Sequence, residues 1–275
     1  MSTPTYFGPF SVLARLPDLQ VTIEPPFHGF SGAVYHRIVE RGDDDQTWYL
    51  RHAPPPGRLL DLCCGAGRHL RAFAEAGWHV TGVELADGAL SRAAALRASA
   101  PADTRARMVL QRADARQVRL GQPVDCVLIG GLSFALFDRG DRQALLRTAR
   151  AHLAPGGRLL FDYSPRQPGV ADRQDVVGVP LRGGAGSGFA WIGWRRSDRA
   201  GVQHTNIYGE LVEPGAPTRR YLSTVSIDLL DEEELAADLA AARLRADRSS
   251  DRAVPAAQTS SPAMPVRMMS CEALP

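Results

Sequence analysis

Five short apolar runs, separated by helical patterns or short loops, constrain the fold of this chain more than any other feature. The runs cover residues 58–63, 79–85, 106–113, 123–130 and 157–163. They are apolar almost throughout, which is typical of parallel strands covered on both faces. Helical patterns lie at 67–76, 88–99 and 142–153, the last with Asp141 as its expected N-terminal cap. This alternation predicts an α/β fold with a doubly wound, mostly parallel, Rossmann-like sheet.

The residues on either side of this alternation are expected to add to the core. Residues 165–188 are rich in proline and glycine and are expected to form a flexible connection. The strand patterns that follow have no helices between them, which predicts an inserted antiparallel β lid. The chain is therefore expected to have four parts. Residues 1–57 form an N-terminal helical cap segment, and residues 58–164 form the core. Residues 165–230 form the connection with the lid, and residues 231–275 form a C-terminal helix and a final strand that completes the core.

Composition narrows the functions open to this chain. Its 275 residues carry a net charge of +2, and all 32 basic residues are arginine. Without lysine the chain cannot form a lysine-dependent P-loop or a pyridoxal Schiff base. The scattered, near-neutral charge argues against a nucleic-acid partner, and no apolar run is long enough to span a membrane. The four cysteines lack metal-ligand spacing, so we expect no metal site and a reduced, cytoplasmic protein.

Acidic residues and glycines stand where the expected strands end. Gly65 and Gly67 lie between the first strand and the first helix, and Glu84 ends the second strand nineteen residues after Gly65. Asp114 follows the third strand, and Gly130 ends the fourth. Parallel strands meet at one edge of an open sheet, where such folds bind ligands. The pattern therefore predicts a nucleoside site, with Glu84 accepting hydrogen bonds from ribose hydroxyls.

Two residues indicate which nucleoside is bound. A dinucleotide fingerprint requires a third glycine, but Leu70 occupies that position. Asp61 precedes the glycines, and its carboxylate would repel a polyphosphate and favour a ligand with an amino group. S-adenosylmethionine is a nucleoside derivative that also carries an ammonium group, so it fits both indications.

Residues 58–164 resemble the class I S-adenosylmethionine-dependent methyltransferases of the small-molecule type. The resemblance rests on five ordered segments, which look like the successive motifs of that family: Leu60–Arg68, Val80–Leu85, Gln111–Ala115, Asp125–Gly130 and His152–Leu160. Family members often carry a further glycine after Gly67, where this chain has Arg68 and His69. That departure places one of these two side chains near the methionine carboxylate.

The resemblance implies a role for each matched residue. Asp61 would lie near the amino group, Glu84 would hold the ribose and Leu85 would flank the adenine. Asp114 would accept a hydrogen bond from the adenine amino group, and Gly130 would line the methyl-donor end. The full cofactor site implied in this way is Asp61, Cys63, Gly65, Gly67, Glu84, Leu85, Asp114, Ala115 and Gly130.

The resemblance also implies an activity, which is methyl transfer from S-adenosylmethionine to a small organic acceptor in secondary metabolism such as antibiotic biosynthesis. Nitrogen or oxygen is the favoured acceptor atom, and carbon methylation stays open. No catalytic residue is identified, and the candidates for a base are His28, Tyr35, His204 and Tyr208. A nicotinamide-dependent oxidoreductase on a similar sheet and a noncatalytic cofactor-binding protein are the alternatives. The oligomeric state is open, with a homodimer as one option.

Overall fold

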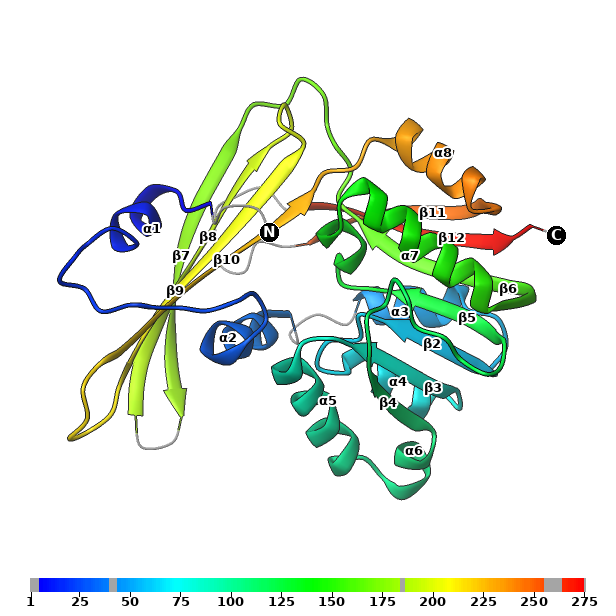
Figure 1. Cartoon of the computed structure of the whole chain (residues 1–275), viewed down its shortest axis with the longest axis horizontal. Helices are drawn as coiled ribbons and strands as arrows, with labels where there is room; N and C mark the ends of the chain where they lie inside the picture. The colour runs from blue at the N-terminus through cyan, green and yellow to red at the C-terminus, as the bar shows by residue number, and fades with distance from the viewer. Residues whose placement is uncertain (1–4, 40–43, 184–185, 255–263, 275) are drawn as a thin grey trace. The chain divides into compact units, whose positions relative to one another are not determined.

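The computed structural model describes residues 5–39, 44–183, 186–254 and 264–274, which form two compact units (Figure 1). The first unit draws its described residues from 1–39 and 167–227. The second comprises described parts of 40–166, 228–254 and 263–275. Each unit is built on its own β-sheet. Among the described residues, no helix is both long and apolar enough to cross a membrane.

The second unit contains a seven-stranded sheet in the order β11-β12-β6-β5-β2-β3-β4. Five of its strands are mutually parallel, β12 runs antiparallel to β6, and β11 runs antiparallel to β12. The strands are β2 (Arg58–Leu62), β3 (His79–Glu84), β4 (Met108–Arg112), β5 (Val124–Ile129), β6 (Leu153–Tyr163), β11 (Leu244–Val254) and β12 (Met264–Ala273). This mostly parallel sheet confirms the predicted fold class.

The order in which the chain adds parallel strands to this sheet changes direction at β2. From β2 it proceeds outward through β3 and β4, and then returns to build β5 and β6 on the other side of β2. In the central register Leu60 pairs with both Thr81 of β3 and Val127 of β5. A crevice forms at such a switch point, beyond the carboxyl ends of the strands, so the topology places the ligand-binding edge there.

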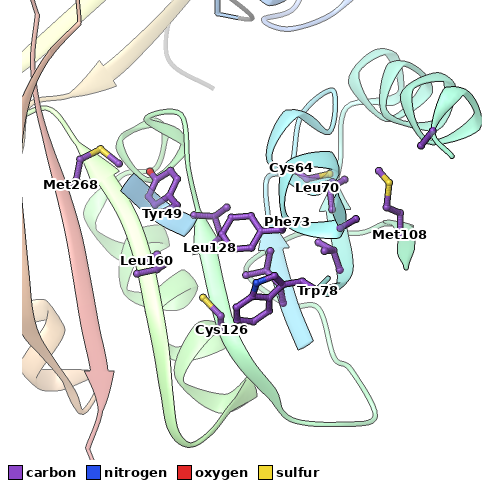
Figure 2. Close-up of a cluster of buried hydrophobic side chains, with 14 of the residues drawn as sticks. Tyr49, Cys64, Leu70, Phe73, Trp78, Met108, Cys126, Leu128, Leu160 and Met268 are labelled. Atoms are coloured by element: carbon purple, nitrogen blue, oxygen red, sulfur yellow. The ribbon is translucent and has the colours of Figure 1, made fainter. Parts of the chain in front are cut away.

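Helices cover the sheet of the second unit because its strands are apolar on both faces. These helices are α3 (Asp44–His52), α4 (Arg68–Glu75), α5 (Asp87–Ser99), α6 (Ala102–Ala106), the 3₁₀ turn η1 (Ser133–Leu136), α7 (Arg139–His152) and α8 (Glu232–Ala241). Figure 2 shows part of the resulting core, in which Phe73 and Trp78 pack with Leu128 and Leu160. Tyr49 of α3 is also fully buried in this cluster.

Aspartate side chains cap two helices of the second unit. Asp231 caps α8, where its carboxylate accepts hydrogen bonds from the backbone N–H groups of Glu233 and Glu234. The expected cap at Asp141 is wrong. The cap of α7 is Asp138, which accepts from the Asp141 N–H at 2.9 Å, so the helix begins nearly one turn earlier.

The first unit contains a five-stranded sheet in the order β1-β10-β9-β8-β7. Its long strands are antiparallel where β7 meets β8 and β8 meets β9, and the short β1 runs parallel to β10. The elements are α1 (Gly8–Leu13), β1 (Thr22–Ile23), α2 (Gly29–Val39), β7 (Arg173–Gly183), β8 (Gly186–Ser197), β9 (Val202–Val212) and β10 (Arg219–Asp228).

Two glycines let helices approach this sheet closely. A Cβ on Gly193 of β8 would lie 2.4 Å from the Phe10 ring of α1, and one on Gly209 of β9 would lie 2.0 Å from Phe30 of α2. Gly209 pairs with Ala190, three residues from Gly193, so the two glycines face opposite sides of the sheet. The helices therefore cover the two faces of one antiparallel layer.

Residues 173–183, expected within a flexible connection, instead form β7. They pair with β8 along their whole length, from Arg173 opposite Arg196 to Gly183 opposite Gly186. Pro180 made this segment look unlike a strand. Because β7 is at the edge of the sheet, however, a missing N–H need not interrupt a ladder.

Leu128 lies on β5, between β6 and β2, and is fully buried in the core. We expect Leu128→Ala to lower the free energy of unfolding by about 2–5 kcal/mol, because the lost methyl groups leave a cavity. Val109→Ala on β4 is the control, since Val109 is 55% exposed and should change stability by less than about 0.5 kcal/mol. Urea denaturation followed by circular dichroism measures both. Equal losses would contradict the position of β5 in the core.

Candidate cofactor site

The nine residues predicted to hold the cofactor all belong to the second unit. They stand at or just beyond the carboxyl ends of four adjacent strands, β2, β3, β4 and β5. The four candidates for a base, His28, Tyr35, His204 and Tyr208, belong to the first unit. The predicted cofactor residues therefore lie along one edge of one sheet, whereas the base candidates belong to other elements.

The turn after β2 is built from residues with left-handed backbone. Cys63, Gly65 and Gly67 have φ angles of 62°, 57° and 88°. Gly67 is also the N-cap residue of α4, and its Cβ position lies 3.2 Å from Ala93, which leaves little room for a side chain. The turn brings backbone to the sheet edge and directs the N-terminus of α4 toward it, an arrangement suited to close contact with a ligand.

Asp61 is the most constrained polar group at this edge. Its side chain is 1% exposed, and its Oδ2 atom accepts no hydrogen bond. Burial, together with the nearby Glu84 carboxylate, raises the pKa of Asp61 well above its ordinary value. A buried carboxyl oxygen without a donor fits a ligand that brings a positively charged N–H group. The residues present therefore fit the amino group of S-adenosylmethionine.

The Glu84 carboxylate ties the end of β3 to the turn after β2. Its Oε2 accepts from the Gly65 N–H at 2.9 Å, and its Oε1 accepts from the N–H groups of Leu85 and Ala86 at 2.8 Å each. A carboxylate offers roughly four acceptor sites, so capacity for a ribose hydroxyl remains. Leu85 next to it is 55% exposed, so its side chain is accessible to a ligand at this edge.

Asp114 is engaged by a partner that the sequence did not reveal. Arg116 binds it through Nη2 at 2.6 Å and reaches Asp141 through Nη1 at 2.7 Å. Hydrogen bonds from Arg116 hold the pKa of Asp114 below its ordinary value. The predicted bond from Asp114 to an adenine amino group would therefore share this carboxylate with Arg116. Ala115 between them is buried.

A buried polar cluster behind the turn was also missed. Asp45 of α3 pairs with Arg68 of α4, with Arg68 Nη1 donating to Asp45 Oδ1 at 2.7 Å. His69 Nε2 lies 3.7 Å from Asp45 Oδ2. A Cβ on Gly130 would approach His69 Nε2 to 2.8 Å and the Tyr49 ring to 3.3 Å, so only glycine fits at that strand end.

Asp162, at the end of β6, is the second acid of this cluster. Its Oδ1 accepts from the Leu132 N–H at 2.8 Å, which fixes the loop after Gly130. Burial raises the pKa of Asp162 to about 7. A lone acid inside the apolar run 159–163 was a visible signal for this residue, whereas Asp45 and Tyr49 stand in a polar segment that shows none.

The base candidates have local partners within the first unit. His204 Nδ1 lies 2.7 Å from Ser226 Oγ, and burial lowers its pKa. The Tyr208 hydroxyl donates to Glu210, and burial followed by that bond raises its pKa. Tyr35 packs edge-on against Phe27. Among the described residues, no group of three His, Cys, Asp or Glu side chains could hold a metal ion.

Comparison with known families and curated proteins gives partial matches. Residues 59–157 match the family described as a methyltransferase domain. The chain is 33% identical over 136 residues to the dTDP-3-amino-3,6-dideoxy-alpha-D-glucopyranose N,N-dimethyltransferase of Streptomyces fradiae, covering 49% of each chain. It is 37% identical over 67 residues to the putative methyltransferase YqeM of Bacillus subtilis (strain 168), covering 24% of this chain and 27% of that protein. The matches thus span only a quarter to a half of these relatives.

Solved structures match over nearly the whole chain. The sugar N-methyltransferase KedS8 of a Streptoalloteichus species superposes with a TM-score of 0.71 at 19% identity, covering 93% of this chain and 98% of that one. DesVI of Streptomyces venezuelae superposes with a TM-score of 0.66 at 21% identity, covering 88% and 98%. These likenesses establish a shared fold.

Residues 59–157 match a methyltransferase domain, and the chain shares its fold with a solved methyltransferase, as the resemblance predicts. Because the chain spans at most half of the curated relatives it matches, the activity of the whole chain is treated below as a proposal.

Asp162 is expected to make stability depend on pH. Its pKa is about 7 in the folded chain and about 3.9 in an unfolded one. Between these values the folded state holds a proton that the unfolded state releases. The free energy of unfolding should therefore fall as pH rises from about 4 to 7, by on the order of 1 kcal/mol per pH unit, and Asp162 should add no further loss above pH 7.

Asp162→Asn keeps an oxygen for the Leu132 N–H and removes the titration. Urea denaturation at several pH values should show a flatter profile for this variant than for the wild type. Asp87→Asn on the exposed start of α5 is the matched control and should follow the wild-type profile. Identical slopes in all three proteins would show that Asp162 does not hold this proton.

Proposed function

We propose that this protein transfers the methyl group of S-adenosylmethionine to the amino nitrogen of a small acceptor, specifically an amino sugar in antibiotic biosynthesis. The observation that carries the proposal is the buried Asp61 carboxylate, whose Oδ2 lacks a hydrogen-bond donor at the end of β2. A cationic amino group supplies that donor.

The other residues of the sheet edge complete the cofactor's surroundings in this proposal. Glu84 accepts from the ribose, and the exposed Leu85 side chain covers one face of the adenine. Asp114, held by Arg116, stands at the end of the adenine. Gly130 stands at the methyl-donor end, where His69 and Tyr49 leave no room for a larger side chain.

When bound, the cofactor supplies an electrophilic methyl group on a sulfonium. The protein's task is then to hold the acceptor nitrogen in line with that methyl group, which by itself contributes much of the rate. An amine acceptor must also be unprotonated, and a nearby base assists if it arrives as ammonium.

Similar proteins support an amino sugar as the acceptor. The curated relative from Streptomyces fradiae is named as a dimethyltransferase of a dTDP-linked 3-amino sugar. Structures with the same fold include the sugar N-methyltransferase KedS8 and the amino pentose methyltransferase CalS10. We extend this acceptor class to the present chain, and we propose a cytoplasmic enzyme without a nucleic-acid partner. A homodimer stays a prediction.

Asp61→Asn and Glu84→Gln should each weaken S-adenosylmethionine binding by roughly ten- to a hundredfold, because each removes a charged acceptor. Glu75→Gln is the control, since Glu75 is an exposed residue of α4 paired with Arg71, and its affinity should equal the wild type's. Isothermal titration calorimetry measures all four proteins. Wild-type affinity in both site variants would refute the site, and tighter wild-type binding of NAD than of S-adenosylmethionine would refute the cofactor.

The acceptor class is tested by product analysis. We expect a dTDP-linked amino sugar to gain 14 or 28 mass units, about the mass of one or two methylene equivalents, with matching release of S-adenosylhomocysteine. The corresponding dTDP-linked sugar with a hydroxyl in place of the amine is the matched control and should not react. Methylation of the hydroxyl sugar alone would instead establish an oxygen acceptor. Binding of the cofactor with no product from either sugar would exclude this acceptor class.

A further inference from the structure

A second hollow lies at the opposite edge of the same sheet, where the parallel strands begin. It encloses about 400 Å³ and is lined by residues that include Arg58, His79, Arg107, Val109, Gly121 and Gln122. All of these residues belong to the second unit. Its volume lies within the range of ordinary small-molecule sites, roughly 300–1,000 Å³.

Three basic side chains stand in one row across the strand starts. Arg58 of β2 pairs in register with His79 of β3. Arg107 is beside His79, because the next residues, Val80 and Met108, are register partners. Side chains in register on parallel neighbours point to the same face of a sheet. Arg58 and His79 therefore point to the same face, and Arg107, the C-cap residue of α6 just before β4, lines the same hollow.

The charge of this row is not neutralised by side chains around it. Within the described part of the chain, neither the Arg58 nor the Arg107 guanidinium forms an ion pair or a side-chain hydrogen bond, and no carboxylate lines the hollow. The nearest acid along the strand starts is Asp125 of β5, whose Oδ2 accepts from the Arg58 backbone N–H at 2.8 Å. The hollow thus has an excess of positive charge.

This hollow is separate from the cofactor site. The same strands that begin with Arg58 and His79 end at Asp61 and Glu84. A strand of five or six residues spans about 15–20 Å, so the basic edge and the acidic edge lie on opposite ends of the sheet. A ligand of the basic edge need not displace the cofactor.

We propose that this hollow binds a small organic phosphate. Paired guanidinium groups recognise phosphate oxygens through two parallel N–H bonds, and the His79 ring adds a further donor. The apolar side of the hollow includes Val109, which is 55% exposed and offers a surface for the organic part of the ligand. The site is independent of the acceptor, whose reaction belongs to the other edge.

Calorimetry with phenyl phosphate, in 0.15 M NaCl so that diffuse attraction is screened, tests this site. The wild type should bind one phenyl phosphate, and Arg58→Gln and Arg107→Gln should each weaken binding roughly tenfold. Arg71→Gln on α4 removes one positive charge from a residue that does not line the hollow, and it should leave binding unchanged. Saturating S-adenosylhomocysteine should also leave it unchanged.

Several results would overturn the proposal. The first is no binding by the wild type at 20 mM phenyl phosphate, and the second is equal binding by the wild type, Arg58→Gln and Arg107→Gln. The third is competition by S-adenosylhomocysteine, because it would place the phosphate at the cofactor edge. Thermal unfolding of each variant checks that it is folded. If Arg58→Gln is unstable, Arg58→Lys replaces it and should weaken binding by a smaller factor, because an ammonium group keeps the charge but cannot form two parallel N–H bonds. Failure of this test leaves cofactor binding untouched, so the two proposals are judged separately.

Discussion

The parallel pairing of β2 with β3 on one side and β5 on the other is the constraint on which the cofactor site depends. It buries Asp61 at the centre of the sheet and brings Glu84 level with the turn that follows β2. Glu84 then closes the arrangement by accepting the Gly65 N–H, so one carboxylate joins two strand ends. A change in this register would separate the acids and remove the site, even if every strand still formed.

This arrangement buries two acidic side chains, and their burial is energetically unfavourable. Asp61 and Asp162 both have raised pKa values because burial disfavours their charged forms. Such groups do not arise from packing alone, since an apolar side chain would fill either position at lower cost. Asp162 is partly compensated by the Leu132 N–H, and Asp61 is compensated by the ligand it is proposed to bind. These buried acids therefore lower the stability of the ligand-free chain at the edge where we propose that the cofactor binds.

The sequence predicted the core of the fold well because both signals it relied on are local. Apolar strand runs and helical patterns identified β2 through β6, and glycines with strand-end acids identified the edge where they gather. It failed where pairing partners decide the structure. β7 exists because it pairs with β8 along eleven residues, which overrides the proline and glycine content of its sequence. The start of α7 shifted because Asp138, not Asp141, completed the cap.

By itself, the sequence determined the class of sheet, the acidic and glycine-rich edge and the preference for a cationic nucleoside, because each follows from residue type and spacing along the chain. Tertiary structure alone decided which charges are buried and with whom they pair. Arg116 is bound to Asp114, Asp45 holds Arg68, and three basic residues from separate segments line one hollow. Contacts between residues distant in sequence arise only when strands and helices pack.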